Sequence, residues 1–365
     1  MAGNSLGKEF VLTLFGESHG KCVGVAVDGC PAGLQLCEAD VQRELDKRIP
    51  KGSGIVSSRI EEDKVEILSG TFEDRTTGAP IAMIVRNRDV DSRPYELVKD
   101  VPRPGHADYP ARVRYGGFND YRGGGQFSGR MTAALVMAGA VAKKLLARAG
   151  VEVLACALSI GDVRSRTNLT REELRASVYE NPVRCGDRNA ALLMEKSVRQ
   201  AAESRDSLGG VVRVIAYDVP PGIGDPPFGS LDSELSQALF SIPAVKGVEF
   251  GSGFGAAQSK GSQNNDPLTV VKGNVAFRTN NAGGVLGGLS TGQEIVAQVA
   301  FKPTPSISRP QMSVDLQSMK ETELNLAGRH DPCIVPKAVP VVEAMVSIVL
   351  ADFMIRSGRI SRILK

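Results

Sequence analysis

Three histidines are the side chains in this sequence best suited to acid–base chemistry, and each lies in a short polar turn. His19 stands in the run GESHG, His106 in RPGHAD and His330 in GRHDP. Imidazole changes its charge near neutral pH, so a histidine can give or take a proton during a reaction. The turn around His19 predicts an exposed side chain. Three ordinary surface histidines are the alternative explanation.

The spacing of these residues indicates neither a zinc site nor a serine triad. No two histidines lie within one helical turn and no cysteine shares their spacing, so no metal ligand is predicted. The residues around Ser18 match G-x-S-x-G, but that motif needs a strand–turn–helix context, and the segment that follows is strand-like. The six cysteines form no C-x-x-C motif, which favours reduced thiols in a cytosolic protein.

A glycine-rich loop that runs into an apolar helix is the second chemical feature. Residues 123–125 are all glycine, and Ser128 is a typical helix N-cap. Residues 131–142 are apolar on every face, which predicts a buried helix. Free N–H groups at such a helix start can bind an anion, although a tight turn before a core helix is the alternative. The loop is not a Walker motif, because Arg130 stands where a lysine is needed.

Arginine-rich and proline-rich segments point to a small anionic ligand. Twelve arginines lie between Arg43 and Arg130, and guanidinium groups bind phosphate and carboxylate bidentately. Residues 87–120 form a long loop-rich segment, which in a compact domain is usually functional or disordered. Its prolines favour the ordered case. Most surface arginines are merely solvated, so the pattern alone does not define a site.

The remaining segments predict the elements that must position these loops. Strands are predicted at residues 10–15, 23–28, 64–70, within 76–85, and at 151–160, 210–218, 247–250, 269–277 and 294–301. Helices are predicted at residues 38–48, 128–150, 189–204, 231–239 and 337–357. This irregular alternation predicts an α+β protein with antiparallel sheets rather than a doubly wound parallel fold. Length alone favours two or three domains, but no linker or repeat marks a boundary.

Composition excludes two broad classes of protein. The net charge of the 365 residues is only +3, which argues against a general nucleic-acid binder. The longest apolar tract, residues 335–354, contains Lys337, Glu343, Asp352 and two prolines, which predicts a core helix rather than a membrane span. The N-terminus has no apolar signal core, so a cytoplasmic protein is expected.

Taken together, the motifs resemble chorismate synthase over nearly the whole chain and in the family's order. They are TLFGESHG at 13–20, RPGHADY at 103–109, DYRGGG at 120–125 with SGR at 128–130, VKGVEFG at 245–251, GSQNND at 261–266, NNAGGVLGG at 280–288, KPTPSI at 302–307 and GRHDPC at 328–333. GESHG, RPGHAD and GRHDP are each quite specific. The resemblance implies a carbon–oxygen lyase that converts 5-enolpyruvylshikimate 3-phosphate to chorismate and phosphate by anti elimination. It also implies a need for reduced FMN without net redox change, as cofactor chemistry that the protein positions.

Residue roles follow from the matched motifs. The resemblance implies catalytic roles for His19 at the substrate phosphate, His106 near the flavin and Asp331 in proton relay. It implies that four arginines line the substrate and flavin pocket, namely Arg48, Arg103, Arg130 and Arg329. Flavin-binding positions match Gln126, Phe127, Ser128, Gly287, Lys302, Pro303, Thr304, Pro305, Ser306 and Arg329. The alternative explanation is that Gly287 is needed only for the conformation of its turn, and that His330 only holds its loop in place.

Three departures from the family pattern affect the cofactor sites. Gln126 and Phe127 replace residues that include an arginine in many relatives, so flavin contacts there are expected through the backbone. Pro243 replaces an asparagine, so no side-chain amide can bind FMN at that position. Gly54 replaces an arginine that the family associates with NADPH, which leaves Arg48 alone at the nicotinamide site. The sequence therefore gives little support for direct NADPH binding.

For architecture, the resemblance implies one integrated domain over residues 1–365, with helices sandwiched between antiparallel sheets, assembling as a homotetramer. The long insertion of the bifunctional fungal relatives is missing, so reduced FMN is expected from a separate flavin reductase or from the medium. Two other classes of protein account for these features less well. An NAD-type dehydrogenase lacks the G-x-G-x-x-G opening of a βαβ unit. A non-catalytic nucleotide-binding or scaffold protein would differ by releasing no phosphate when supplied with reduced FMN.

Overall fold

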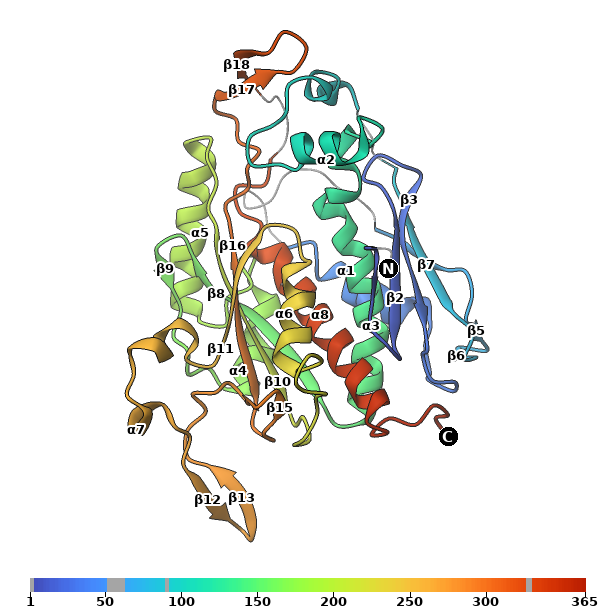
Figure 1. Ribbon diagram of the computed structural model, residues 1–365, viewed down its shortest axis with the longest axis vertical. Coiled ribbons are helices and arrows are strands. Elements are labelled where there is room, and N and C mark those ends of the chain that lie inside the picture. The colour runs from blue at the N-terminus through green and yellow to red at the C-terminus, as the bar shows by residue number, and fades with distance from the viewer. Residues whose placement is uncertain (1–2, 51–62, 89–91, 326–329) are drawn as a thin grey trace.

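Two five-stranded antiparallel sheets form the framework of the protein (Figure 1). The computed structural model describes residues 3–50, 63–88, 92–325 and 330–365. The first sheet has the spatial order β1 (Ser5–Leu6), β2 (Val11–Gly16), β3 (Cys22–Asp28), β7 (Ile81–Arg86) and β4 (Val65–Ile67). The second sheet has the order β11 (Val245–Phe250), β16 (Ile295–Phe301), β10 (Gly210–Tyr217), β8 (Glu152–Ile160) and β9 (Val163–Arg164). The expected α+β class with antiparallel sheets is confirmed.

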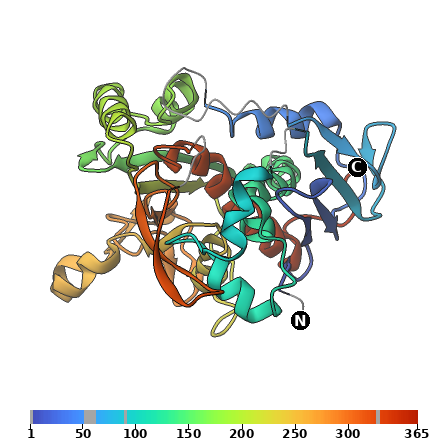
Figure 2. The same ribbon diagram turned by 90° about the horizontal axis from the view of Figure 1, so that it is seen from above.

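Helices pack between and beside these sheets. The α-helices are α1 (Glu38–Asp46), α2 (Asp108–Tyr115), α3 (Thr132–Arg148), α4 (Arg171–Ser177), α5 (Arg188–Glu203), α6 (Leu231–Phe240), α7 (Gly261–Asn264) and α8 (Val335–Arg356). Helix α3 packs on β3 and β7 of the first sheet, and α8 packs on β8 and β10 of the second. The two helices also pack extensively against each other (Figures 1 and 2). They therefore form the interior layer that joins the two sheets.

Small and apolar side chains explain how closely α3 and α8 approach. All residues from Thr132 to Ala142 are buried, as the sequence predicts. A Cβ added at Gly139 would lie 2.3 Å from the Cβ of Ala344, so only glycine allows this contact. Of the helices described, α8 is long and apolar enough to cross a membrane, but that stretch is entirely buried inside the protein. The predicted core helix is confirmed.

Four short hairpins project from the framework. They are β5 (Thr71–Phe72) with β6 (Arg75–Thr76), β12 (Leu268–Val271) with β13 (Asn274–Phe277), β14 (Val285–Leu286) with β15 (Leu289–Ser290), and β17 (Gln311–Asp315) with β18 (Lys320–Leu324). The single strand predicted at 269–277 is wrong. Lys272 and Gly273 have positive φ values of 50° and 78°, so the chain reverses there and forms the β12–β13 hairpin.

Most other predicted elements are confirmed within a few residues, and the differences lie in polar segments. Helix α2 falls inside the segment 87–120, which is predicted to be loop-rich, and α4 lies where no helix or strand is predicted. Both helices are short and present few apolar residues to the core, with only Ala111 and Leu174 buried. Without an apolar stripe, periodicity could not reveal them.

Candidate active site

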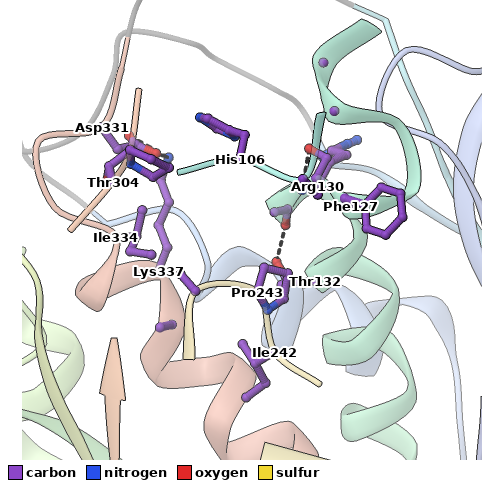
Figure 3. A pocket seen from close by; sticks show the side chains of 18 of the residues that line it. His106, Phe127, Arg130, Thr132, Ile242, Pro243, Thr304, Asp331, Ile334 and Lys337 are labelled. Atoms are coloured by element: carbon purple, nitrogen blue, oxygen red, sulfur yellow. Dashed lines mark hydrogen bonds and ion pairs between the residues drawn. The ribbon is translucent and has the colours of Figure 1, made fainter. Parts of the chain in front are cut away.

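A cavity of about 720 Å³ opens at the N-terminal ends of α3 and α8. This volume lies within the range of about 300–1,000 Å³ that is typical of small-molecule sites. Four loops contribute its walls, at residues 103–108, 119–130, 240–245 and 301–305. Figure 3 shows Asp331, Thr304 and Lys337 on one side and Arg130, Thr132 and Phe127 on the other. Distant parts of the sequence thus meet around one space.

His106 lines this cavity and is held by a residue from the 301–305 side. Its Nε2 lies 2.7 Å from the hydroxyl oxygen of Ser306. Burial, together with the nearby positive charge of Arg103, lowers the pKa of His106 from 6.5 to about 4, although the Asp108 carboxylate acts in the opposite sense. The imidazole is therefore neutral at neutral pH, which suits a group that donates or accepts one hydrogen bond.

The loop that carries His106 is fixed by a buried ion pair. Arg103 donates from Nε and Nη2 to both carboxylate oxygens of Asp108, at 2.7 and 2.8 Å. The Arg103 backbone N–H donates to the same carboxylate at 3.0 Å. Both side chains are largely buried. The guanidinium fork of Arg103 is thus engaged by its own loop, and its predicted contact with substrate stays a prediction.

Arg48 and Arg130 also line the cavity, and one carboxylate joins them. Asp63 accepts from Arg48 Nη1 at 2.7 Å through Oδ2 and makes a close contact with Arg130 Nη1 through Oδ1. Asp63 is only 5% exposed. Arg48 Nη2 also donates to the hydroxyl of Thr132 at 3.1 Å, at the start of α3. The structure therefore brings three of the four predicted arginines, Arg48, Arg103 and Arg130, to one cavity, and Asp63 joins two of them.

His19 is buried behind the glycine loop, so the expectation of an exposed side chain is wrong. Its Nδ1 lies 2.9 Å from the Ser92 hydroxyl, and its ring meets Tyr95 edge-on with centroids 5.0 Å apart. A Cβ added at Gly123 would lie 2.3 Å from His19 Cδ2 and 2.6 Å from Nε2. Gly123 lines the cavity, whereas His19 does not. The ring thus lies directly behind one residue of the cavity wall.

The triple glycine gives the loop a conformation that other residues rarely adopt. Gly123, Gly124 and Gly125 have φ values of 60°, 85° and 52°. Ser128 then caps the short turn before α3, accepting from the Arg130 N–H at 3.2 Å, and its hydroxyl donates to Ser18 at 3.2 Å. Ser128 is therefore an N-cap, as predicted, but of this short turn, and α3 itself begins at Thr132. The turn carrying His19 and the start of the helix are therefore joined.

The predicted flavin positions divide between the cavity and its surroundings. Gln126, Phe127, Ser128, Lys302, Thr304 and Pro305 line the cavity. Lys302 Nζ donates to the Gly105 carbonyl at 2.5 Å, and burial, together with Lys246, lowers the pKa of Lys302. The hydroxyl oxygen of Thr304 is buried and finds no hydrogen-bond partner among the described residues. A polar atom buried in this way at a cavity wall is suited to a ligand.

Asp331 lies on the same wall, next to a lysine that sequence reasoning did not assign to the site. Lys337 Nζ donates to both carboxylate oxygens of Asp331, at 2.9 and 2.7 Å. Lys337 belongs to the first turns of α8, and both residues line the cavity. The ion pair holds the carboxylate at the start of the helix. The described part of the chain contains no group of three or more His, Cys, Asp or Glu arranged to hold a metal ion.

Comparison with known proteins decides the family. The family model described as chorismate synthase matches residues 10–355. The chain belongs to the chorismate synthase family. Members of this family are enzymes of the shikimate pathway, which serves aromatic amino acid biosynthesis.

Individual chorismate synthases match over almost their whole length. The protein of Korarchaeum cryptofilum is 53% identical over 359 residues, covering 98% of this chain and 99% of the relative. That of Methanocella arvoryzae is 53% identical over 361 residues, with coverages of 99% and 96%. A crystal structure of chorismate synthase superposes with a TM-score of 0.76 at 30% identity, covering 96% of this chain and 93% of that one.

Besides His19, three described residues assigned by likeness to chorismate synthase do not line the cavity. Gly287 lies in the tight turn between β14 and β15, with φ of 59° and open space where a Cβ would be. Its geometry fits the explanation that the turn alone needs glycine. Pro303 follows the cavity-lining Lys302 without lining the cavity itself, and Ser306 acts through His106. Their flavin-binding roles stay predictions.

Two further assignments lie outside the described residues. Arg329, expected to bind substrate and flavin, falls in the undescribed segment 326–329. Gly54, on which the argument against NADPH partly depends, falls in segment 51–62. Arg48, the other residue expected at a nicotinamide site, is engaged by Asp63.

Sequence reasoning missed the polar partners that fix the chorismate synthase site. Asp63, Asn87, Asp108 and Lys337 each bind a predicted site residue or its loop. Asp108 lies in the RPGHADY motif, and its short spacing from Arg103 could have suggested an ion pair within that loop. Asp63 lies 15 positions from Arg48, so only the fold makes that contact evident.

Proposed function

We propose that this protein catalyses the elimination of phosphate from 5-enolpyruvylshikimate 3-phosphate to give chorismate, with reduced FMN bound and no net redox change. The observation that supports the proposal is one cavity that Arg48, Arg130, His106 and Asp331 all line, with Arg130 and Asp331 on opposite sides (Figure 3). Those residues come from four separate parts of the sequence. Anion-binding groups and proton-carrying groups are the two kinds of side chain that loss of phosphate and hydrogen requires.

The residues present fit a flavin mononucleotide. The buried Thr304 hydroxyl can hydrogen-bond a polar ring edge, and Lys302 and the backbone of residues 126–128 supply donors for ring or phosphate oxygens. Phe127 is 43% exposed beside the cavity and offers an apolar face. Reduced FMN, when bound, would lend electron density to the elimination and take it back, as the family generally needs a reduced flavin. The protein supplies position and excludes water.

The arginines would hold the anionic groups of the substrate. Arg48 and Arg130 reach the cavity with planar guanidinium groups already fixed by Asp63. A fixed fork loses little side-chain entropy when it binds phosphate or carboxylate, and it sets the direction in which the phosphate leaves. Arg103 and Arg329 are proposed to complete this set.

Three further residues would control protons. His19 is proposed to protonate the departing phosphate from behind Gly123, where a small movement of the glycine loop would expose its Nε2. His106, which is neutral at neutral pH, would keep one hydrogen bond of fixed direction at the cavity, because Ser306 holds its Nε2. Asp331, held by Lys337, is the carboxylate available to take up the released proton.

The proposal extends to the organisation of the protein. One hydrophobic core runs from Phe10 to Ile360, which supports a single integrated domain with its helices sandwiched between the sheets. The β12–β13 hairpin exposes Val270 and Val275, at 71% and 74%, which supports assembly with further copies into the homotetramer expected from the family. We also propose a cytoplasmic location and reduction of FMN by a separate flavin reductase, with no NADPH site in this chain.

Phosphate release under anaerobic conditions tests the proposed reaction. The purified protein is mixed with substrate and photoreduced FMN, and inorganic phosphate and chorismate are measured together. The proposal predicts equal amounts of the two products, and none with oxidised FMN. Phosphate without chorismate would indicate simple hydrolysis and would contradict the proposal, as would full activity without flavin.

A further inference from the structure

A buried chain of polar contacts joins the arginines to the turn that carries His19. It begins at Asp63, which lies just before β4 and is 5% exposed. Each of its carboxylate oxygens contacts a different arginine, Arg48 through Oδ2 at 2.7 Å and Arg130 through Oδ1. A single carboxylate thus sets the separation between two guanidinium groups.

Each arginine has a second anchor on a different element. Arg48 Nη2 donates to the Thr132 hydroxyl at 3.1 Å, and that hydroxyl donates to the Gly129 carbonyl at 2.6 Å. Arg130 Nε donates to the side-chain oxygen of Asn87 at 3.0 Å. A guanidinium held at two points is fixed in its plane as well as in its position.

Asn87 continues the chain to the histidine. Its amide nitrogen donates to the Glu17 and Gly20 carbonyls, at 2.9 and 3.0 Å. Those carbonyls bracket His19 in its turn. Arg130 and the His19 turn are therefore attached to opposite ends of one amide group, and a shift of either would move the other.

We infer that Asp63 and Asn87 are positioning residues of this site, Asp63 setting the Arg48–Arg130 pair to receive the anionic groups of the substrate and Asn87 setting that pair relative to His19. The inference rests on the proposed function. Neither residue touches the substrate in this account, and each acts through the side chains it holds.

Removing the charge of Asp63 should change the substrate affinity in opposite directions under the two explanations, positioning and simple electrostatics. The substrate carries a phosphate and two carboxylates, so deleting a negative charge beside the arginines should tighten its binding if charge alone mattered. If Asp63 positions the arginines, Asp63→Asn should weaken binding, because two guanidinium groups lose a shared partner and repel each other. The sign of the change separates the two explanations.

Substrate binding to the full-length protein in the presence of oxidised FMN, followed by calorimetry, is the test. Asp63→Asn is expected to raise the Kd about tenfold or more. The matched control is Glu66→Gln. Glu66 lies on β4, an exposed edge strand of the first sheet, and this change also removes one negative charge from a carboxylate that is bound to an arginine. It should bind as the wild type does. Tighter or unchanged binding by Asp63→Asn would overturn the role of Asp63.

Kinetics with reduced FMN separate the two positioning roles. Asp63→Asn should raise KM more than it lowers kcat, whereas Asn87→Ala should lower kcat about tenfold with KM nearly unchanged. An equal effect on both constants in both variants would overturn the division of roles. Should Asp63→Asn fail to fold, Thr132→Val removes the second anchor of Arg48, together with the hydrogen bond from Thr132 to the Gly129 carbonyl, and should raise KM alone. A wild-type protein that binds no substrate would overturn the proposed function, and this inference with it.

Discussion

The Nε2 of His106 lies 2.7 Å from the Ser306 hydroxyl, although the two residues are 200 positions apart. This contact joins the RPGHAD loop to the KPTPS segment. It fixes which ring nitrogen is engaged and leaves Nδ1 as the other site for a proton or a ligand. The His106 ring is thus oriented by the fold as well as by its own loop.

Replacing His106 by alanine is expected to lower kcat by about 100-fold, the size typical of a lost acid–base group. Ser306→Ala, which leaves the ring but removes its partner, should give a smaller loss of about tenfold. Steady-state assays with reduced FMN measure both. The unfolding midpoints of the two variants serve as the control for folding. Wild-type turnover of His106→Ala would remove this residue from the mechanism.

The lowered pKa of His106 predicts a pH-dependent stability. The unfolded protein binds a proton at His106 near pH 6.5, whereas the folded protein does so only near pH 4. Folding therefore becomes less favourable as the pH falls between these values, and the cost at pH 5 relative to pH 7 is about 2 kcal/mol. Urea unfolding of wild type and His106→Asn at both pH values should show a steeper loss in the wild type. Parallel losses would contradict the assigned pKa.

Gly123 is predicted to be required for the placement of His19. Alanine at Gly123 adds a Cβ that would lie 2.3 Å from the His19 ring, at a positive φ. Gly117→Ala is the matched control, because φ is also positive there but nothing lies within 4 Å of the added Cβ. Gly117→Ala should cost about 1–2 kcal/mol in unfolding free energy, and Gly123→Ala should cost more, because its Cβ also overlaps the His19 ring. Only Gly123→Ala should reduce turnover, by tenfold or more, and equal turnover of the two variants would contradict the contact.

Lys337 and Asp331 are predicted to act as one unit. Lys337→Met and Asp331→Asn should each lower turnover by about tenfold or more, and the double variant should be no worse than the poorer single one. The reason is that the lysine contacts both oxygens of the carboxylate and each residue is ineffective without the other. Lys337→Arg should restore much of the loss. Additive losses in the double variant would show that the two residues act separately.

The sequence predicted the framework well where burial gives the apolar residues a regular spacing or a long continuous run. The helices predicted at 128–150 and 337–357 correspond to α3 and α8, and they were recovered because long apolar runs admit few alternatives. The β12–β13 hairpin was missed because its strands are apolar yet exposed, so the apolar pattern gave no indication of the turn at Gly273.

For the site, the sequence identified candidate residues but not how they are held. His106, Asp331, Arg48 and Arg130 were identified, and they do meet at one cavity. The burial of His19 could not be predicted, because Tyr95 covers its ring from a segment 76 positions away along the chain, and only tertiary structure brings the two together. The contacts of partners such as Asp63 could not be predicted for the same reason.

The central claim is that the protein uses reduced FMN as a catalyst and does not reduce it. Chorismate formation is measured anaerobically with substrate in large excess over FMN, once with photoreduced FMN and once with oxidised FMN plus NADPH. The account predicts many chorismate molecules for each photoreduced FMN, with the flavin still reduced at the end, and no product in the NADPH reaction. One chorismate or fewer per flavin, or rapid turnover with NADPH alone, would contradict it.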